Sequence, residues 1–231
     1  MKNEKALRKK VKEINDILEE EFGIPQLEKD LNKMDRDPLD SLINTILSQN
    51  TNDVNRDKAY NNLRQQFPKW EDVLAADAED IADAIRVGGL ANQKSVRIKG
   101  VLEWIKENYG ELNIDFICDM EPQEAIELFS QLKGVGLKTM NVVLAFACGR
   151  DVFPVDTHIF RITKRLDIVP EKATADKAHE IMGRLFPEGK AFSFHINLIR
   201  FGRTRCHARN PECKGCPLMD YCSAWPEFLE D

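Results

Sequence analysis

Residues 132–139 read Leu-Lys-Gly-Val-Gly-Leu-Lys-Thr, and an apolar run from Met140 to Cys148 follows at once. Two glycines, two positions apart, let the backbone take positive φ values and let a large ligand approach its N–H groups. The apolar run predicts a helix that begins beside this turn. The first turn of a helix presents unpaired N–H groups and the positive end of the helix dipole. The stretch therefore predicts a tight turn that opens a helix and offers a seat for an anion such as phosphate.

The residues before the turn, 124–132, read Glu-Ala-Ile-Glu-Leu-Phe-Ser-Gln-Leu and predict another helix over 125–132. Two helices joined by such a turn form a helix-hairpin-helix, which commonly holds nucleic-acid backbone without reading bases. A Gly-x-Gly turn before a helix is also common as plain structure, so these residues alone leave both interpretations open. Lys138 stands in the first helical turn, an unfavourable place for a cation that draws attention to its amine as a nucleophile.

The composition is that of an ordinary globular protein. The chain has 231 residues, enough for one or two domains with a real core, and 42% of them are hydrophobic. No apolar run approaches the length that a bilayer requires, and the first ten residues lack the apolar segment of a secretory signal. Two isolated cysteines, Cys118 and Cys148, stand among apolar neighbours and are predicted to be core residues. We expect a cytoplasmic protein without membrane contact.

The net charge of −6 argues weakly against a nucleic-acid partner. Binding depends, however, on where the cations lie rather than on their total. Acidic residues gather at 19–21 and 72–83, and basic residues gather at 161–165 and 200–209. This distribution predicts an acidic side and a separate basic binding face.

Apolar residues recur at spacings of three and four along most of the chain, which is the period of amphipathic helices. The predicted helices are 5–22, 39–49, 54–67, 70–75, 81–85, 95–109, 125–132, the one after the glycine turn, 157–166, 174–186 and 189–203. Asp77 and Thr174 are predicted helix N-caps, and 112–118 is predicted as an extended loop. About ten helices and essentially no strand make the predicted fold class all-α.

Four of the six cysteines lie close together near the C-terminus, as Cys206-x6-Cys213-x2-Cys216-x5-Cys222. Four neighbouring thiolates are the ligand set of a tetrahedral zinc ion or of an iron–sulfur cluster. Zinc modules usually present two C-x2-C pairs, whereas one pair and two single cysteines are present here. The spacing therefore favours a [4Fe–4S] cluster, with zinc as the alternative.

Three segments together resemble the endonuclease III family of helix-hairpin-helix DNA glycosylases. They are Leu-Lys-Gly-Val-Gly-Leu-Lys-Thr-Met-Asn-Val-Val at 132–143, Val-Asp-Thr-His-Ile-Phe-Arg at 155–161, and the cysteine pattern at 206–222. The similarity runs from about residue 36 to about residue 225, with the motifs in the family's order and at family-like spacing.

The resemblance implies two α-helical domains with a DNA cleft between them. One is a six-helix domain over 36–150 that contains the helix-hairpin-helix. The other combines 1–35 with 151–231 and holds a [4Fe–4S] cluster on the four C-terminal cysteines. The implied partner is double-stranded DNA with damaged pyrimidines or abasic sites. The protein would act as a monomer in the cytoplasm, associated with the nucleoid if the source is prokaryotic.

On this resemblance Lys138 matches the family's nucleophile and Asp156 its catalytic aspartate. The amine would attack the sugar C1′ of a flipped-out nucleotide and expel the base, and the Schiff base would then let the 3′ phosphate leave by β-elimination. The carboxylate would stabilise the cationic sugar and help to deprotonate the amine. Asp156 also stands where a plain N-cap is expected, and both roles can hold together. The implied function is base-excision repair of oxidised or damaged pyrimidines, with AP lyase activity.

The resemblance also assigns contacts with DNA. The hairpin's contacts would fall on Gly134, Val135, Gly136 and Thr139. Leu90 matches an apolar wedge that fills the space left by an extruded base, although it could be an ordinary buried leucine. The family usually has a glutamine in the polar turn to plug the vacated site. That position is Asn50 here, with Gln49 one residue earlier, so either could plug the site or simply cap a helix.

Two other functions fit parts of the sequence. One is a monofunctional glycosylase for mismatched thymine or uracil, and the other is a non-catalytic helix-hairpin-helix protein that binds DNA. Relatives of the mismatch type usually lack a lysine at the position of Lys138. Lys138 together with Asp156 therefore favours the bifunctional glycosylase and lyase over both alternatives.

Overall fold

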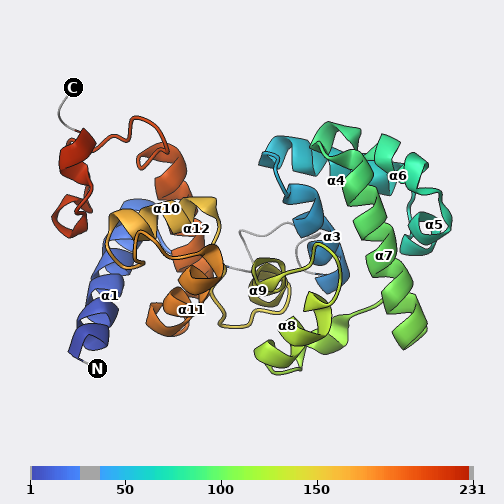
Figure 1. The fold of residues 1–231 in the computed structure, drawn as a ribbon, viewed down its shortest axis with the longest axis horizontal. Coiled ribbons are helices and arrows are strands. Elements are labelled where there is room, and N and C mark those ends of the chain that lie inside the picture. Colours follow the sequence, from blue (N-terminus) through green and yellow to red (C-terminus); the bar gives the residue numbers. More distant parts are fainter. Residues whose placement is uncertain (1, 27–36, 229–231) are drawn as a thin grey trace. The chain divides into compact units, whose positions relative to one another are not determined.

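The computed structural model describes residues 2–26 and 37–228, and these residues contain helices, turns and loops but no strand (Figure 1). The predicted all-α fold class is confirmed. The helices are α1 (Lys2–Phe22), α3 (Pro38–Ser48), α4 (Asp53–Gln66), α5 (Trp70–Ala75), α6 (Ala78–Ala84), α7 (Ala91–Tyr109), α8 (Pro122–Ser130), α9 (Leu137–Phe146), α10 (Thr157–Arg165), α11 (Ala175–Leu185) and α12 (Ala191–Thr204). Short 3-10 turns are η2 (Arg86–Gly88), η3 (Asp115–Cys118), η4 (Met219–Tyr221) and η5 (Trp225–Phe228). Across the described ranges, none of these helices combines the length and the hydropathy needed to cross a bilayer.

The chain divides into two compact units. The hairpin unit is Leu31–Arg150, and the cysteine unit combines Met1–Asp30 with Asp151–Asp231. The predicted division between residues 35 and 36 lies outside the described residues. The hairpin unit contains α3 to α9, and the cysteine unit contains α1 and α10 to α12.

The core of the hairpin unit is built on α3, which packs against α9, α4 and α7. The helix begins after Asp37, whose Oδ1 accepts hydrogen bonds from the backbone N–H groups of Leu39 and Asp40, both at 2.9 Å. Pro38 occupies the first helical position, where its missing N–H carries no penalty. The buried apolar side chains of α3 are Leu39, Leu42, Ile43, Ile46 and Leu47. The helix ends at Ser48, directly before the polar turn that carries Gln49 and Asn50.

The core of the cysteine unit forms where α1 and α10 pack against α12 (Figure 1). Val11, Ile14 and Leu18 recur at helical spacing on α1 and are fully buried. The stacked rings of Phe153 and Phe186 extend this core, with their centroids 5.4 Å apart. The N-terminal helix thus completes a core that is otherwise made by the C-terminal third of the chain.

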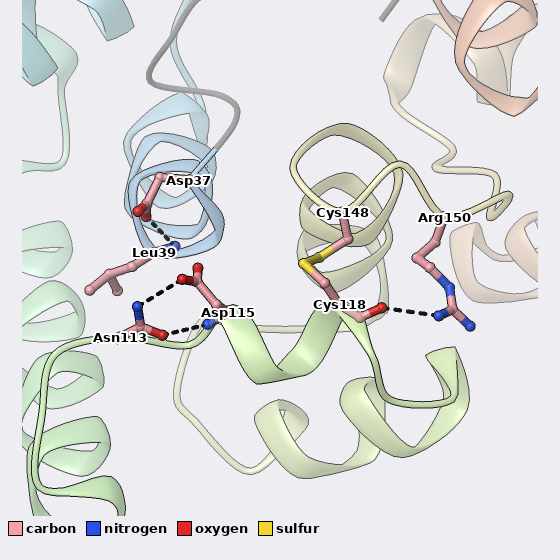
Figure 2. The surroundings of a disulfide bond; sticks show 7 residues. All are labelled: Asp37, Leu39, Asn113, Asp115, Cys118, Cys148 and Arg150. Atoms are coloured by element: carbon pink, nitrogen blue, oxygen red, sulfur yellow. Dashed lines mark hydrogen bonds between the residues drawn. A yellow bond between two sulfur atoms is a disulfide. The ribbon is translucent and has the colours of Figure 1, made fainter. Parts of the chain in front are cut away.

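Two predictions of local structure differ from the fold. Residues 112–118 are not extended, because Asn113 closes a turn that begins the 3-10 segment Asp115–Cys118. Its Oδ1 accepts from the backbone N–H of Asp115 at 2.7 Å, and its amide nitrogen donates to the carboxylate of Asp115 at 2.8 Å (Figure 2). Asp77 precedes α6 as expected, but its side chain makes no capping hydrogen bond. Thr174 does cap α11, by accepting from the N–H of Lys177.

The prediction that Cys118 and Cys148 are core residues is wrong. The two are half-buried and joined by a disulfide, with their Cα atoms 4.9 Å apart (Figure 2). Arg150 provides a second link between these two segments, because its Nη1 donates to the carbonyl oxygen of Cys118 at 3.0 Å. Apolar neighbours in the sequence do not reveal which distant thiol a cysteine meets. The disulfide spans both helices of the helix-hairpin-helix, α8 and α9, and closes the loop that contains them.

Replacing both cysteines, as Cys118→Ser with Cys148→Ser, is expected to lower the free energy of unfolding. A covalent link between residues 30 positions apart restricts the unfolded chain, and its removal costs about 3 kcal/mol. Urea unfolding of the oxidised protein and of the double variant measures this difference. Oxidised and variant proteins with equal unfolding midpoints would contradict the prediction.

Candidate active site and cluster-binding loop

The glycine turn opens α9 as predicted, but only one of its two glycines uses a positive φ. Gly134 has φ +90°, whereas Gly136, the N-cap of α9, is extended at φ −120°. The side chain of Val135 is only 3% exposed and anchors the turn in the hairpin unit. The backbone N–H of Val135 donates to the carbonyl oxygen of Leu132 at 3.0 Å, which closes the turn. The helix-hairpin-helix is therefore formed by α8, this turn and α9, which pack on each other.

Gly134 is also approached closely by a side chain. A Cβ atom at this position would lie 2.6 Å from Cδ of Arg97, so a larger residue would require the side chain of Arg97 to move. The side chain of Arg97 thus lies flat against the turn. Thr139, which was assigned a DNA contact, is only 5% exposed, so its side chain is packed inside the unit.

Lys138 is exposed and lies in the first turn of α9. Within the described parts of the chain, no side chain forms an ion pair or hydrogen bond with its amine. Asp156 is the half-buried N-cap of α10, and its Oδ1 accepts from the backbone N–H of Ile159 at 2.8 Å. The capping role predicted for Asp156 is confirmed. Lys138 belongs to the hairpin unit and Asp156 to the cysteine unit.

Two buried histidines, which the sequence did not single out, hold the backbone just before Asp156. His179 Nε2 accepts from the N–H of Val155 at 3.0 Å, and His195 Nδ1 lies 2.9 Å from the carbonyl oxygen of Pro154. Because a carbonyl oxygen can only accept, that nitrogen of His195 donates. The two rings fix the direction in which the chain enters α10, and hence the place of the Asp156 carboxylate within the cysteine unit.

Leu90 and Asn50 share an unusual backbone conformation. Both lie in the left-handed region, at φ +48° and φ +54°, and both are exposed. Leu90 is 44% exposed and is the N-cap residue of α7, which rules out the interpretation that it is an ordinary buried leucine. A leucine with positive φ costs about 1 kcal/mol or more, and such strain is typical of functional sites.

Gln49 differs from its neighbour Asn50. Its side chain is half-buried, and both ends of its amide are engaged. Nε2 donates to the carbonyl oxygen of Gly134 at 3.0 Å, and Oε1 accepts from Nη1 of Arg97 at 2.7 Å. Gln49 therefore ties the polar turn to the hairpin, and Asn50 is the residue of the pair that presents its side chain to solvent.

The four C-terminal cysteines line one cavity of the cysteine unit, together with the apolar side chains of Leu166, Phe201, Leu218 and Trp225. Arg165 reaches into this loop, where its Nη1 lies 3.2 Å from Sγ of Cys206 and 2.7 Å from the carbonyl oxygen of His207. Arg161 donates to the carbonyl oxygens of Gly202 and Cys206. These two arginines come from α10, and the sequence did not identify them as neighbours of the cysteines.

Burial in the cavity changes the pKa of three of the four cysteine thiols. Burial is the main cause that raises the pKa of Cys213, Cys216 and Cys222 above that of a free thiol, and the neighbouring cysteine sulfurs raise it further. A group of thiolates in such a place needs positive charge, which an iron–sulfur core and the nearby arginines supply. No three His, Cys, Asp or Glu side chains within residues 2–26 and 37–228 already surround a single-ion position. The donor chemistry, one cavity lined by four sulfurs with the cation of Arg165 among them, fits a cluster.

Comparison with known proteins identifies relatives for both the helix-hairpin-helix region and the cysteine loop. Residues 43–188 match the family described as HhH-GPD superfamily base excision DNA repair protein, and residues 206–222 match the iron-sulfur binding domain of endonuclease III. Endonuclease III of Thermotoga maritima is 32% identical over 191 residues, which cover 83% of this chain and 85% of that protein. A candidate DNA glycosylase of Arabidopsis thaliana is 36% identical over 192 residues, which cover 79% of this chain and 66% of that protein.

A solved structure of a trapped endonuclease III–DNA covalent intermediate has the same fold. It aligns with a TM-score of 0.81 at 26% identity, over 96% of this chain and 99% of that one. The first family match spans more than half of the chain, and the Thermotoga relative is matched over most of its length. The chain therefore belongs to the endonuclease III family of helix-hairpin-helix DNA glycosylases of base-excision repair, and its C-terminal cysteines form the domain that binds the family's [4Fe–4S] cluster.

Proposed function

We propose that this enzyme removes oxidised or damaged pyrimidines from duplex DNA and then cleaves the strand at the abasic site. The observation that carries the proposal is the exposed amine of Lys138 in the first turn of α9, beside the glycine turn, with no side-chain partner among residues 2–26 and 37–228. An amine in that place can meet deoxyribose while the turn holds the neighbouring phosphates. The covalent intermediate in the related solved structure is a property of that protein, and the fold similarity supports the same chemistry here.

In the proposed reaction, the amine of Lys138 forms a bond to the sugar C1′ as the bond from C1′ to the base breaks. The base leaves with the electron pair of that bond and is protonated. The nitrogen loses its proton, and opening of the sugar gives a Schiff base. Loss of a C2′ proton then expels the 3′ phosphate by β-elimination, which cuts the strand. The carboxylate of Asp156 would stabilise the cationic sugar and accept a proton from the amine.

DNA binding in this proposal falls to the hairpin unit. The N–H groups at the start of α9 and the glycine turn would hold phosphates, as helix N-termini commonly do. The exposed side chain of Leu90 would enter the space left by the extruded pyrimidine, and that of Asn50 would face the opposite base. Extrusion costs a few kcal/mol of stacking, which an apolar wedge offsets in part. One copy of the chain carries every group named here, so we propose that it acts as a monomer.

The proposed reaction is tested with a duplex that contains thymine glycol, incubated with the cluster-loaded protein and borohydride. The expected result is a covalent protein–DNA adduct together with strand cleavage in the absence of borohydride. Base release without an adduct would instead identify a monofunctional glycosylase, such as one that acts on mismatched thymine or uracil. Tight binding without base release or adduct on any of these duplexes would identify a DNA-binding protein without this chemistry.

When bound, the cluster would be held by Cys206, Cys213, Cys216 and Cys222 and would link these positions of the loop, and none of the chemical steps above depends on it. Replacing Cys216, whose thiol lines the cavity, with serine is expected to remove bound iron, because a hydroxyl is a poor ligand for it. Metal analysis of the protein as isolated should find about four irons per chain, and far fewer in the variant. One zinc per chain in the protein as isolated would contradict the assignment of a [4Fe–4S] cluster.

A further inference from the structure

Lys94, in the first turns of α7, is fully buried, with none of its surface exposed. Its Nζ donates to the carbonyl oxygen of Leu47 at 2.7 Å and to that of Gly88 at 2.9 Å. Burial, and to a smaller extent the charge of Arg97, lower the pKa of Lys94 to about 8. Burying an ammonium group costs free energy of folding, and hydrogen bonds to neutral carbonyl oxygens offset this cost only in part.

The two carbonyl groups that Lys94 binds belong to two separate segments of the proposed DNA-binding surface. Leu47 is in the last turn of α3, just before Gln49 and Asn50. Gly88 ends η2, just before Leu90. Lysine at position 94 therefore joins the turn that carries the proposed plug to the loop that carries the proposed wedge.

Glycine at position 88 leaves little room beside its backbone. A Cβ atom there would lie 3.1 Å from Cβ of Ala59 on α4 and 3.9 Å from Nζ of Lys94. The chain at η2 is thus pressed against α4 on one side and approached by the ammonium group on the other. The close fit fixes the direction in which the backbone leaves η2 toward Leu90.

Arg97, one turn further along α7, extends the same connection to the hairpin. Its Nη1 donates to Oε1 of Gln49, and Nε2 of Gln49 donates to the carbonyl oxygen of Gly134. Its stem also lies against Gly134, where a Cβ atom would require that stem to move. Lys94 and Arg97 of α7 thus connect three segments of the hairpin unit. These segments are the loop before Leu90, the polar turn and the glycine turn.

We infer that Lys94 and Arg97 are positioning residues that hold the wedge loop, the polar turn and the hairpin in one register, so that Leu90 and Asn50 enter the duplex together. The inference rests on the proposed function for the roles of Leu90 and Asn50. Neither cation has a chemical role in the proposed reaction. Lys94 acts through the backbone before the two exposed residues, and Arg97 acts through Gln49, which explains why Gln49 is not itself available as the plug.

Hydrogen exchange of the free protein tests the register without any activity measurement. Lys94→Met keeps the apolar stem but removes both hydrogen bonds. It is expected to speed exchange of the amide groups at 48–51 and 88–91 by about tenfold or more. Lys99→Met is the matched control, because Lys99 lies on the same helix and its Nζ donates to the carbonyl oxygen of Ala76, at 2.6 Å, rather than to either loop. Unchanged exchange at both loops in Lys94→Met, or equal changes in the control, would overturn the inference.

Base release under single-turnover conditions tests the consequence for the reaction. Lys94→Met should slow it about 100-fold, because a displaced wedge misplaces the extruded nucleotide. Lys94→Gln keeps an N–H donor and should recover part of the rate, whereas the Lys99→Met control should match the unmodified protein. A loss that tracks thermal stability alone, with no recovery in Lys94→Gln, would contradict a positioning role. If Lys94→Met does not fold, Lys94→Gln carries both the exchange and the rate measurement.

A double-variant cycle separates positioning from general damage. Lys94→Met and Leu90→Ala should together slow base release no more than the stronger of the two alone, because both act through the same insertion step. Multiplicative effects would overturn the inference. A protein that releases no base before any substitution would refute the proposed function instead, and the exchange measurement would then decide the register by itself.

Discussion

Lys138→Gln is expected to abolish covalent trapping by borohydride and to lower strand cleavage at an abasic site by about 10⁴-fold or more. The reason is that glutamine has no amine that can form a Schiff base, while its length and helix propensity are close to those of lysine. Lys138 is exposed on α9, so the substitution leaves no buried group unpaired and should not change the melting temperature. Gel detection of the trapped adduct and single-turnover cleavage measure the two effects.

Lys133→Gln provides the matched control for this experiment. Lys133 is also exposed and lies in the same hairpin, directly before Gly134. Its loss removes one positive charge near the proposed phosphate site, so DNA binding should weaken modestly, mainly at low salt, while trapping persists. Trapping by Lys138→Gln at the level of the unmodified protein would show that another amine is the nucleophile.

The second large effect is expected from Asp156→Asn, which separates the two roles of this residue. Asparagine caps helices about as well as aspartate, so the hydrogen bond to Ile159 and the stability of α10 should be retained. A neutral amide cannot accept a proton or stabilise a cationic sugar. Base release should therefore fall by about 10³-fold with little change in melting temperature.

The control for Asp156→Asn is the same substitution at Asp37, which caps α3 through two backbone N–H groups. Asp37→Asn should leave both stability and base release close to those of the unmodified protein. If Asp156→Asn released base at the normal rate, Asp156 would be a helix cap and nothing more. If Asp156→Asn lowered the rate of base release only to the extent that it unfolded the protein, Asp156 would likewise be a helix cap and nothing more.

Local signals in the sequence were sufficient for most of the helices. Apolar spacing predicted α1, α4 and α7 to within a few residues at each end, and Thr174 and Asp156 were correctly predicted as caps. Such signals lie within a few residues of one another, so tertiary contacts are not needed to detect them. The 3-10 turn at Asp115–Cys118 was missed because alternating polarity is also produced by a turn that Asn113 closes.

The candidate site was predicted less completely, because its supporting contacts join distant segments. The exposed amine of Lys138, the cap at Asp156 and the glycine turn follow from neighbouring residues. The engagement of Gln49 does not, since its partners Arg97 and Gly134 are 48 and 85 positions away. For the same reason the sequence left Gln49 and Asn50 as equal candidates, and only the fold shows that Gln49 is hydrogen-bonded within the unit while Asn50 is exposed.

By itself, the sequence determined that this chain is all-α, that a glycine turn opens α9 with Lys138 in its first turn, and that four cysteines provide thiolates. Periodicity and spacing carry that information. The tertiary structure alone decided that Lys94 is buried against two carbonyl groups and that Cys118 meets Cys148. A side chain's burial and partners depend on which remote segments pack together, and packing is settled by the whole core rather than by any one stretch.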